Sequence, residues 1–403
     1  MARHPPGALI VGGAHVSIAV ARSLGRRGIP VWLLANHPLP KFSRYVERSF
    51  HWPDSDEEGV AALLQLGERY DLAGWVLMAT GDRDMRVIAQ NRARLASIFH
   101  VLPAAWDTAQ WAYDKRLSQQ RARSLGIDVP LSFEVNGLDE LDRLDCRFPV
   151  ILKPAFRNGV DAFTLAKAWK ADDREALLAL YRRAAAFIGN EAVMVQEWIP
   201  GSGHAQFSHA GLWRHGEPIA TLTARRTRQY PIDFGRSSTF VETIVQSEVE
   251  ELACRFMRSL NYTGIGELEF KYDARERRFK LLDVNGRFWT WCGLGSLAGI
   301  DFPYLAFQQA RGEVIPPARA RPGVAWMHER ADLKAAYREW RAGTLTLHDY
   351  LTGFRQPLTL ATFALDDPLP ALMELPAALW NRLKSRARAG KTKHGPARLR
   401  VAK

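Results

Sequence analysis

Cysteine is scarce in this chain of 403 residues, which contains only Cys146, Cys254 and Cys292. The three are widely spaced and form no CxxC pair, so the sequence predicts no disulfide framework. Long apolar runs are also missing, and none approaches the length of a membrane-spanning helix. Residues 1–7 hold an arginine, a histidine and two prolines, which is unlike a secretory signal. We therefore expect a cytoplasmic protein.

Acidic residues are absent from the last 22 residues, 382–403, which hold nine basic ones. That tail supplies most of the formal net charge of +12, because the rest of the chain has 46 basic and 43 acidic side chains. A nearly neutral body argues against a nucleic-acid-binding protein, so we expect no nucleic acid partner.

A leucine pattern precedes the basic tail. Its members recur at helical spacing and are Leu372, Leu375, Leu379 and Leu383. Two prolines, Pro370 and Pro376, interrupt the pattern. One interpretation is a helix packed on the body, followed by a disordered tail. The alternatives are nucleic acid binding and peripheral contact of residues 369–403 with the inner face of the membrane, where basic residues face anionic lipid.

The glycine fingerprint of dinucleotide-binding proteins is also missing. Strands are expected at 8–13, 30–34 and 74–79, and a helix at 15–27. The first turn reads Gly12-Gly13-Ala14-His15-Val16-Ser17 and does not match GxGxxG. We expect residues 1–112 to form a Rossmann-like parallel α/β domain that binds substrate or acts as a scaffold, with ligand-binding loops such as Thr80-Gly81-Asp82 after its strands.

A second α/β pattern follows residue 112. The pattern predicts helices at 113–125, 172–187 and 248–260, and strands at 148–153, 192–198, 217–223 and 238–245. Lys115 lies near a helix start and Lys153 at the end of an apolar strand. Gln196, Glu197, Trp198 and Ile199 end another strand. Aromatic clusters around Trp289 and Tyr304 are more typical of a core than of a pocket.

A hairpin is predicted from residues 266–272 and 279–285. Alternation places Glu267, Glu269 and Lys271 on one face of the first strand. On the return strand it groups Phe279, Leu281, Asp283, Asn285 and Arg287. A register that pairs Glu269 with Asp283 brings their side chains to about 5 Å on one face. Two carboxylates and an amide oxygen suit Mg²⁺, although a solvated charged face is the alternative.

With these lysines, the strand-end segment and the hairpin in this order, the chain resembles the ATP-grasp superfamily over roughly residues 1–320. The resemblance implies an ATP-grasp fold of two α+β lobes at 113–320, with the smaller lid lobe at about 126–200. Residues 321–403 are then a C-terminal extension with a basic tail. The implied ligands are ATP and two Mg²⁺ ions.

The resemblance also assigns residues. It implies that Lys115 and Lys153 bind the ATP phosphates and that His204 lies near the ribose. The adenine site corresponds to Gln196, Glu197, Trp198 and Ile199. The magnesium ligands correspond to Glu269, Asp283 and Asn285, with Asp283 in place of the glutamate of the family's Glu-x-Asn-x-Arg segment. Arg287 and Arg225 are expected to stabilise charge during phosphoryl transfer, although a solvated basic strand is the alternative for Arg225.

Two features bear on the activity. The family's glycine-rich lid is replaced by residues 154–161, with a single glycine and with Arg157 as a source of charge. The segment 225–239 looks most like the subgroup that contains D-aspartate ligase. The resemblance thus implies an ATP-dependent ligase that joins a carboxylate to an amine, both amino-acid-like, through an acyl phosphate. A homodimer is compatible with it, and a non-catalytic nucleotide-binding module or a phosphotransferase is the alternative.

Overall fold

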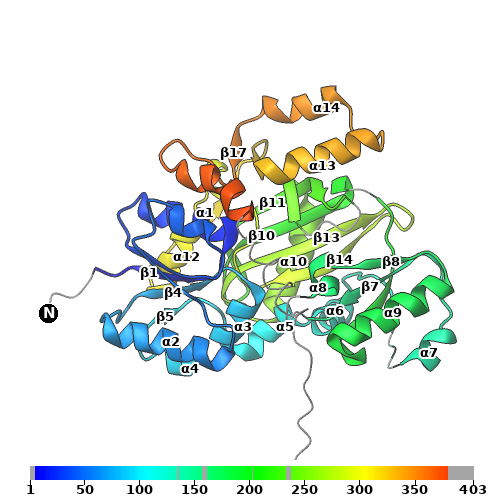
Figure 1. Cartoon of the computed structure of the whole chain (residues 1–403), viewed down its shortest axis with the longest axis horizontal. Helices are drawn as coiled ribbons and strands as arrows, with labels where there is room; N and C mark the ends of the chain where they lie inside the picture. Colours follow the sequence, from blue (N-terminus) through cyan, green and yellow to red (C-terminus); the bar gives the residue numbers. More distant parts are fainter. Residues whose placement is uncertain are drawn as a thin grey trace, which may run out of the picture.

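Three β-sheets organise the chain in the computed structural model, which describes residues 5–133, 135, 137–156, 161–201, 203–232 and 237–379 (Figure 1). We call them sheets A, B and C in chain order. Sheet A belongs to the N-terminal domain, sheet B to a small lobe, and sheet C forms the centre of the molecule. This arrangement confirms the predicted α/β architecture.

Sheet A is entirely parallel, with strand order β3-β2-β1-β4-β5. Its strands are β1 (Ala8–Val11), β2 (Val31–Leu34), β3 (Arg48–Phe50), β4 (Val76–Ala79) and β5 (His100–Val101). The connecting helices are α1 (Ala14–Gly25), η1 (Leu39–Phe42), α2 (Asp56–Arg69), α3 (Asp82–Gln90) and α4 (Arg92–Leu95). The apolar runs of β1, β2 and β4 are buried throughout, as expected for strands covered on both faces. The Rossmann-like domain is confirmed.

Sheet B forms the smaller lobe, with strand order β6-β9-β7-β8. Its strands are β6 (Ser132–Phe133), β7 (Val150–Pro154), β8 (Trp169–Ala171) and β9 (Val193–Glu197). Two helices, α5 (Trp106–Tyr113) and α6 (Lys115–Ser124), precede it, and the lobe itself contains α7 (Leu138–Asp142), α8 (Ala162–Ala166), α9 (Arg174–Ile188) and η2 (Asn190–Ala192). Its apolar side chains form a core of their own around Leu152, Phe163 and Tyr181.

Sheet C has eight strands, ordered β14-β13-β10-β11-β12-β16-β17, with β15 beside β11. They are β10 (Gln206–Arg214), β11 (Glu217–Tyr230), β12 (Ser237–Ile244), β13 (Gly264–Asp273), β14 (Arg278–Asn285), β15 (Ala318–Arg319), β16 (Ala325–Met327) and β17 (Leu358–Leu360). The remaining elements are η3 (Gly203–Ala205), α10 (Ser247–Ser259), α11 (Leu294–Leu297), α12 (Phe302–Ala310), α13 (Glu329–Arg341), α14 (Leu347–Thr352), η4 (Gly353–Arg355) and a last helix over residues 369–379. Within the segment 321–379, β16 and β17 extend the central sheet, and the helices of the segment lie outside that sheet.

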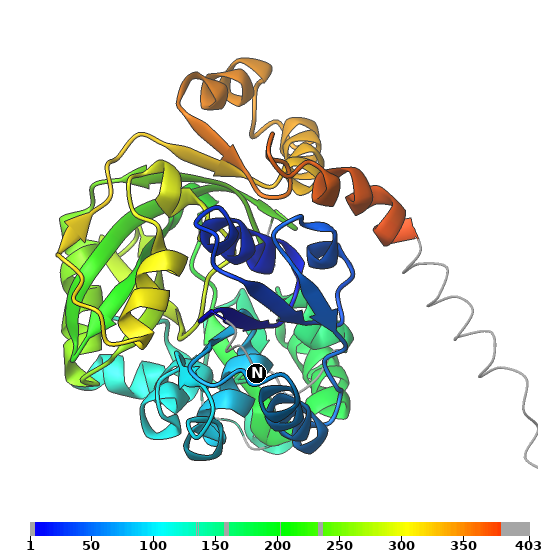
Figure 2. The same ribbon diagram turned by 90° about the vertical axis from the view of Figure 1, so that its left-hand side faces the viewer.

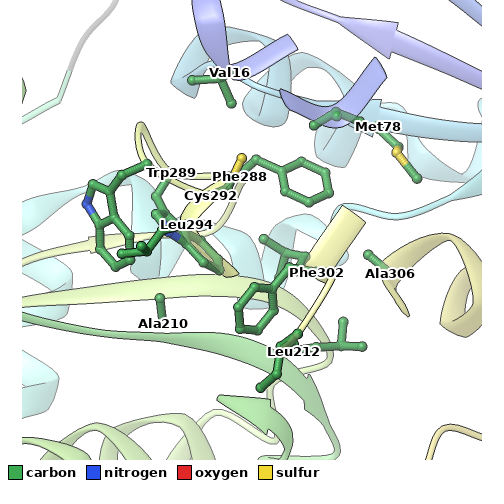
Figure 3. Close-up of a cluster of buried hydrophobic side chains, with 14 of the residues drawn as sticks. Val16, Met78, Ala210, Leu212, Phe288, Trp289, Cys292, Leu294, Phe302 and Ala306 are labelled. Carbon is green, nitrogen blue, oxygen red and sulfur yellow. The ribbon is translucent and has the colours of Figure 1, made fainter. Parts of the chain in front are cut away.

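Sheets A and C share one hydrophobic core. Val16 and Met78 from the N-terminal domain pack in the same cluster as Ala210 and Leu212 of β10 (Figure 3). Between them lies a segment after β14 whose buried side chains include Phe288, Trp289, Trp291, Cys292 and Phe302. Trp289 and Trp291 therefore belong to the core, as predicted for an aromatic cluster. Figure 2 shows the N-terminal domain against this part of the molecule.

The β13–β14 hairpin has the predicted register at its open end, with Glu269 opposite Asp283. The register then shifts by one residue, which leaves Leu282 as the extra residue of a β-bulge. The prediction that Phe279 and Leu281 share a face with Asp283 is therefore wrong. The bulge reverses the alternation, so both apolar side chains join the core beneath the hairpin.

Candidate active site

A cleft lies between the small lobe and sheet C, and sequence segments far apart in the chain meet there. Its lining includes Lys115 from α6, Lys153 from β7 and Asp283 from β14. The predicted strand-end segment contributes all four of its members, Gln196, Glu197, Trp198 and Ile199. A more polar pocket adjoins this cleft and shares Lys115, Glu269 and Asp283 with it. The predicted phosphate-binding, adenine-binding and metal-binding residues are thus brought together.

The three predicted metal ligands lie on one face of the hairpin, at its open end. Glu269 and Asp283 are cross-strand partners, and Asn285 is the partner of Glu267. The Asn285 side-chain amide donates hydrogen bonds to Glu267 and Glu269, each at 3.1 Å. Its oxygen accepts a hydrogen bond from Arg287 at 3.0 Å. The result is a group of oxygen-rich side chains with fixed orientations.

Arg226 on β11 is the cation that neutralises this group. Its guanidinium lies 2.5 Å from Glu269 and 3.1 Å from Glu267. Although burial raises the pKa of Glu269, Arg226 outweighs it and holds that pKa well below its usual range. Burial and the nearby Glu269 charge instead raise the pKa of Glu267. Glu269 is therefore the carboxylate that stays ionised and able to bind a cation.

Three lysines reach the cleft from the small lobe and the helix before it. Lys115, the first residue of α6, forms an ion pair with Asp283 at 2.9 Å. The Lys153 ammonium is buried and lies 3.5 Å from the carbonyl oxygen of Leu282. Burial, with the Lys115 charge next, lowers the pKa of Lys153 to about 8. Lys167, just after α8, lines both pockets. This concentration of positive charge suits a polyphosphate.

Lysine side chains of the β13–β14 hairpin bind the strand-end segment, residues 196–199. The Lys271 ammonium donates hydrogen bonds to the carbonyl oxygens of Ile199 and Gly201, at 2.8 and 3.0 Å. Glu197 forms an ion pair with Lys280 at 2.6 Å and accepts a hydrogen bond from the Leu131 amide at 3.0 Å. The buried Gln196 amide donates to Gln119 and Ser132. The backbone around Trp198 is therefore fixed at the cleft wall.

Arg287 connects the pocket to the N-terminal domain. Its guanidinium donates to Asp82 at 2.5 Å. Although burial lowers the pKa of Arg287, the Asp82 carboxylate opposes this effect, and the pKa is raised overall. Asp82 follows β4, next to β1, where the strand order of sheet A reverses. Ligands of open α/β sheets bind at such a point. A Cβ at Gly12, which has φ +115°, would lie 2.3 Å from the Thr80 hydroxyl, so glycine is required at this edge.

His204 and Arg225 lie elsewhere. Both line a separate pocket with Glu242 and Asp349, and Arg225 forms an ion pair with Glu242 at 3.4 Å. Neither is among the residues that line the two pockets at the hairpin. The strand alternation of β11 explains the difference for Arg225, because its neighbour Arg226 faces the carboxylates instead. Their predicted roles in ribose binding and phosphoryl transfer thus lack support from their positions.

The donor set of the polar pocket fits a hard cation. Glu269 and Asp283 offer two facing carboxylates, and hard cations prefer such oxygen ligands. Both are already paired with cationic side chains, Arg226 and Lys115, which a phosphate group could also bind. The chemistry of the residues is therefore compatible with a metal–nucleotide complex.

Comparison with known families settles the classification. Residues 114–317, half of the chain, match the family described as the carbamoyl-phosphate synthase L chain, ATP-binding domain. The chain belongs to this ATP-grasp family. Among curated proteins, no sequence matches the chain significantly.

Solved structures with an ATP-grasp fold superpose on most of the chain. L-amino acid ligase from Bacillus licheniformis is 16% identical, with a TM-score of 0.60 over 78% of this chain and 76% of that one. Biotin carboxylase from Campylobacter jejuni is 14% identical, with a TM-score of 0.62 over 79% and 74%. N5-carboxyaminoimidazole ribonucleotide synthetase from Thermus thermophilus is 17% identical, with a TM-score of 0.57 over 78% and 81%. At these identities the similarity concerns the fold.

Sequence reasoning missed four residues of this ATP-grasp site: Asp82, Lys167, Arg226 and Glu267. Glu267 and Asp82 carried a signal, since one shares a strand face with Glu269 and the other lies in a predicted ligand loop. Arg226 could not be separated from Arg225 without the β11 register. The predicted role of Arg157 in a lid lies outside the described residues.

Proposed function

We propose that this ATP-grasp protein is an ATP-dependent ligase that joins a carboxylate to an amine. The observation that carries the proposal is the meeting of Lys115, Lys153, Glu269 and Asp283 in one cleft, with Arg287 reaching from it to the N-terminal domain. ATP would occupy the cleft against the strand-end segment 196–199. The carboxylate substrate would lie beside Arg287, at the edge of sheet A.

The proposed ligation takes place in two steps, phosphorylation of the carboxylate and then acyl transfer to the amine. A carboxylate oxygen of the substrate attacks the γ-phosphorus of ATP, the bond to the β-phosphate bridging oxygen breaks, and ADP leaves. The amine then attacks the carbonyl carbon of the acyl phosphate, phosphate leaves, and the nitrogen loses a proton. No covalent bond to the protein is needed, so the contribution of the chain is positioning and charge stabilisation.

The site residues have distinct tasks in this scheme. Lys115 and Lys153 orient the phosphates, and Lys167 adds further positive charge from the small lobe. Glu269, Asp283 and Asn285 would hold Mg²⁺, which when bound screens phosphate charge. Arg287 binds the transferred phosphoryl group or the substrate carboxylate. Because Arg226 contacts Glu267 and Glu269, we assign it the role of balancing their charge, whereas the predicted role of Arg225 in phosphoryl transfer is not kept.

The finer identity of the reaction is also a proposal. Amino-acid-like substrates, as in the D-aspartate ligase subgroup, suit a pocket lined by both arginine and carboxylate side chains. The binding of two Mg²⁺ ions and a homodimeric state remain predictions of the family resemblance, as does a ribose contact from His204.

The test is ADP release by the full chain with Mg²⁺, measured against a panel of amino acids and dipeptides supplied singly and in pairs. We expect ADP release that requires both a carboxylate and an amine, with the coupled product seen by mass spectrometry. Asp283→Asn serves as the inactive control. ATP binding without turnover for every pair would indicate a non-catalytic module, and turnover without an amine would indicate a phosphotransferase.

A further inference from the structure

The last described helix, residues 369–379, packs against the body with a face that lacks its leucines, and the leucines themselves are exposed. Its buried side chains are Pro370, Glu374 and Ala377, spaced four and three residues apart. Its leucines face solvent, with 46%, 67%, 61% and 59% of the residue exposed at Leu369, Leu372, Leu375 and Leu379. A soluble helix normally buries such a row of leucines.

Polar contacts hold the helix in this orientation. Glu374 forms an ion pair with Arg330 of α13 at 2.7 Å, and its other carboxylate oxygen lies 3.4 Å from the Thr362 hydroxyl. Met373, Pro376 and Ala377 cover a pocket at the end of β2. Turning the leucines inward would break these contacts, so their exposure is built into the fold. Figure 2 shows the helix at the edge of the molecule.

The sequence that follows the helix indicates what covers the leucines. The segment 382–403 begins three residues after the last described residue and contains nine basic and no acidic residues. A second copy of this chain would bring two such segments together, which electrostatic repulsion opposes. Nucleic acid would bind the basic residues and leave the leucines in water. An anionic bilayer satisfies both, because acyl chains take the leucines while lipid phosphates attract the basic residues.

We infer that the leucine face of the helix 369–379 is a peripheral docking surface for an anionic lipid bilayer, to which the positive charge of the sequence 382–403 adds attraction. The leucine face enters the boundary between headgroups and acyl chains, and the positive charge of the sequence that follows favours anionic headgroups. No helix within the described ranges is long and apolar enough to span a bilayer. Docking would place the ATP-grasp cleft near a membrane and goes beyond the proposed ligase activity.

The experiment is co-sedimentation of the full chain with vesicles of phosphatidylcholine, alone or with about 30% phosphatidylglycerol. The leucine variant carries Leu372→Ser, Leu375→Ser and Leu379→Ser, and a second variant ends at residue 381. A control with Val245→Ser and Val314→Ser removes exposed apolar side chains elsewhere. We expect binding to anionic vesicles only, weakened at least about tenfold in the first two variants and unchanged in the control.

Because the substituted leucines are exposed, the thermal unfolding midpoint of the leucine variant should equal that of the unaltered chain. Equal binding to neutral and anionic vesicles, or unchanged binding of the leucine variant, would overturn the inference. So would a concentration-dependent dimer in analytical ultracentrifugation that the leucine variant abolishes, since a second copy would then cover this face. Binding of RNA or DNA that depends on the leucines while vesicles are ignored would overturn it as well.

Discussion

The two ends of the β13–β14 hairpin carry similar charges and use them differently. Near the turn, oxygens of Glu197, Asp273 and Glu276 lie within 4.8 Å of one another. The Lys280 ammonium contacts all three, at 2.6, 3.2 and 2.8 Å, and Arg275 adds a second cation beside Asp273. A lysine thus occupies the place that a metal ion would need. This end is a completed structural network.

The open end of the hairpin obtains its cations from distant elements instead. Lys115 pairs with Asp283 from 168 residues away, and Arg226 reaches Glu269 from β11. Cations attached to other elements can turn to a phosphate without unravelling the hairpin. A dense group of carboxylates therefore indicates a ligand site only when the cations that neutralise it can move to a ligand. Of the two ends of the hairpin, the open end meets this condition.

The largest expected effect is on ADP formation, and it should differ between carboxylates at the open end and at the turn of the hairpin. Glu269→Gln and Asp283→Asn keep the side-chain shape but remove the anionic oxygens, so Mg²⁺-dependent ADP formation should fall by about 10³-fold. Glu276→Gln, in the network near the turn, should change it by less than about twofold, because that side chain is half exposed and remote from the phosphates. Steady-state kinetics check both. Comparable losses in all three variants would contradict the distinction.

A second comparison concerns neighbouring arginines on β11. Arg226→Ala removes the cation that contacts both Glu267 and Glu269, which should lower the free energy of unfolding by about 3–5 kcal/mol. Arg225→Ala removes a partly exposed pair with Glu242 and should cost at most about 1 kcal/mol. Urea unfolding followed by circular dichroism measures both. Equal costs would mean that Arg226 is not the charge-balancing residue.

The smallest effect is a pH dependence of nucleotide binding. Lys153 has a pKa lowered to about 8, so it is charged below that pH and becomes neutral above it. Affinity for ATP should therefore be retained at pH 7 and fall by up to about tenfold per pH unit above pH 8. Calorimetric titration at several pH values follows the change.

Lys271 provides the control, because burial lowers its pKa to about 8 too, although its ammonium binds two carbonyl oxygens of the strand-end segment. Lys153→Arg should flatten the pH profile, since guanidinium stays charged, and Lys271→Arg should preserve it. The opposite result would transfer the phosphate-binding role from Lys153 to Lys271.

Much of the fold and part of the site could be predicted from local patterns. Alternation indicated one register that pairs Glu269 with Asp283, without excluding others, and the structure has this pairing. The parallel strands at 8–13, 30–34 and 74–79 were predictable since their apolar runs are bounded by glycine-rich turns. The family resemblance supplied the order of the two lysines and the strand-end segment.

Features that depend on contacts between distant segments could not be predicted. The bulge at Leu282 changes which residues of β14 share a face, and no local pattern marks it. The choice between Arg225 and Arg226 depends on how β11 pairs with β10 and β12. The ion pair of Arg287 with Asp82 requires the N-terminal domain to lie against sheet C, which only packing determines.

The shared core of sheets A and C has a mechanical consequence. Because Val16 and Met78 are packed with Ala210 and Trp289, one continuous core joins the N-terminal domain to the central sheet. The small lobe has its own core and meets that body across the cleft. A change in the width of the cleft that displaces only the small lobe would therefore leave the shared core and the Arg287–Asp82 ion pair intact.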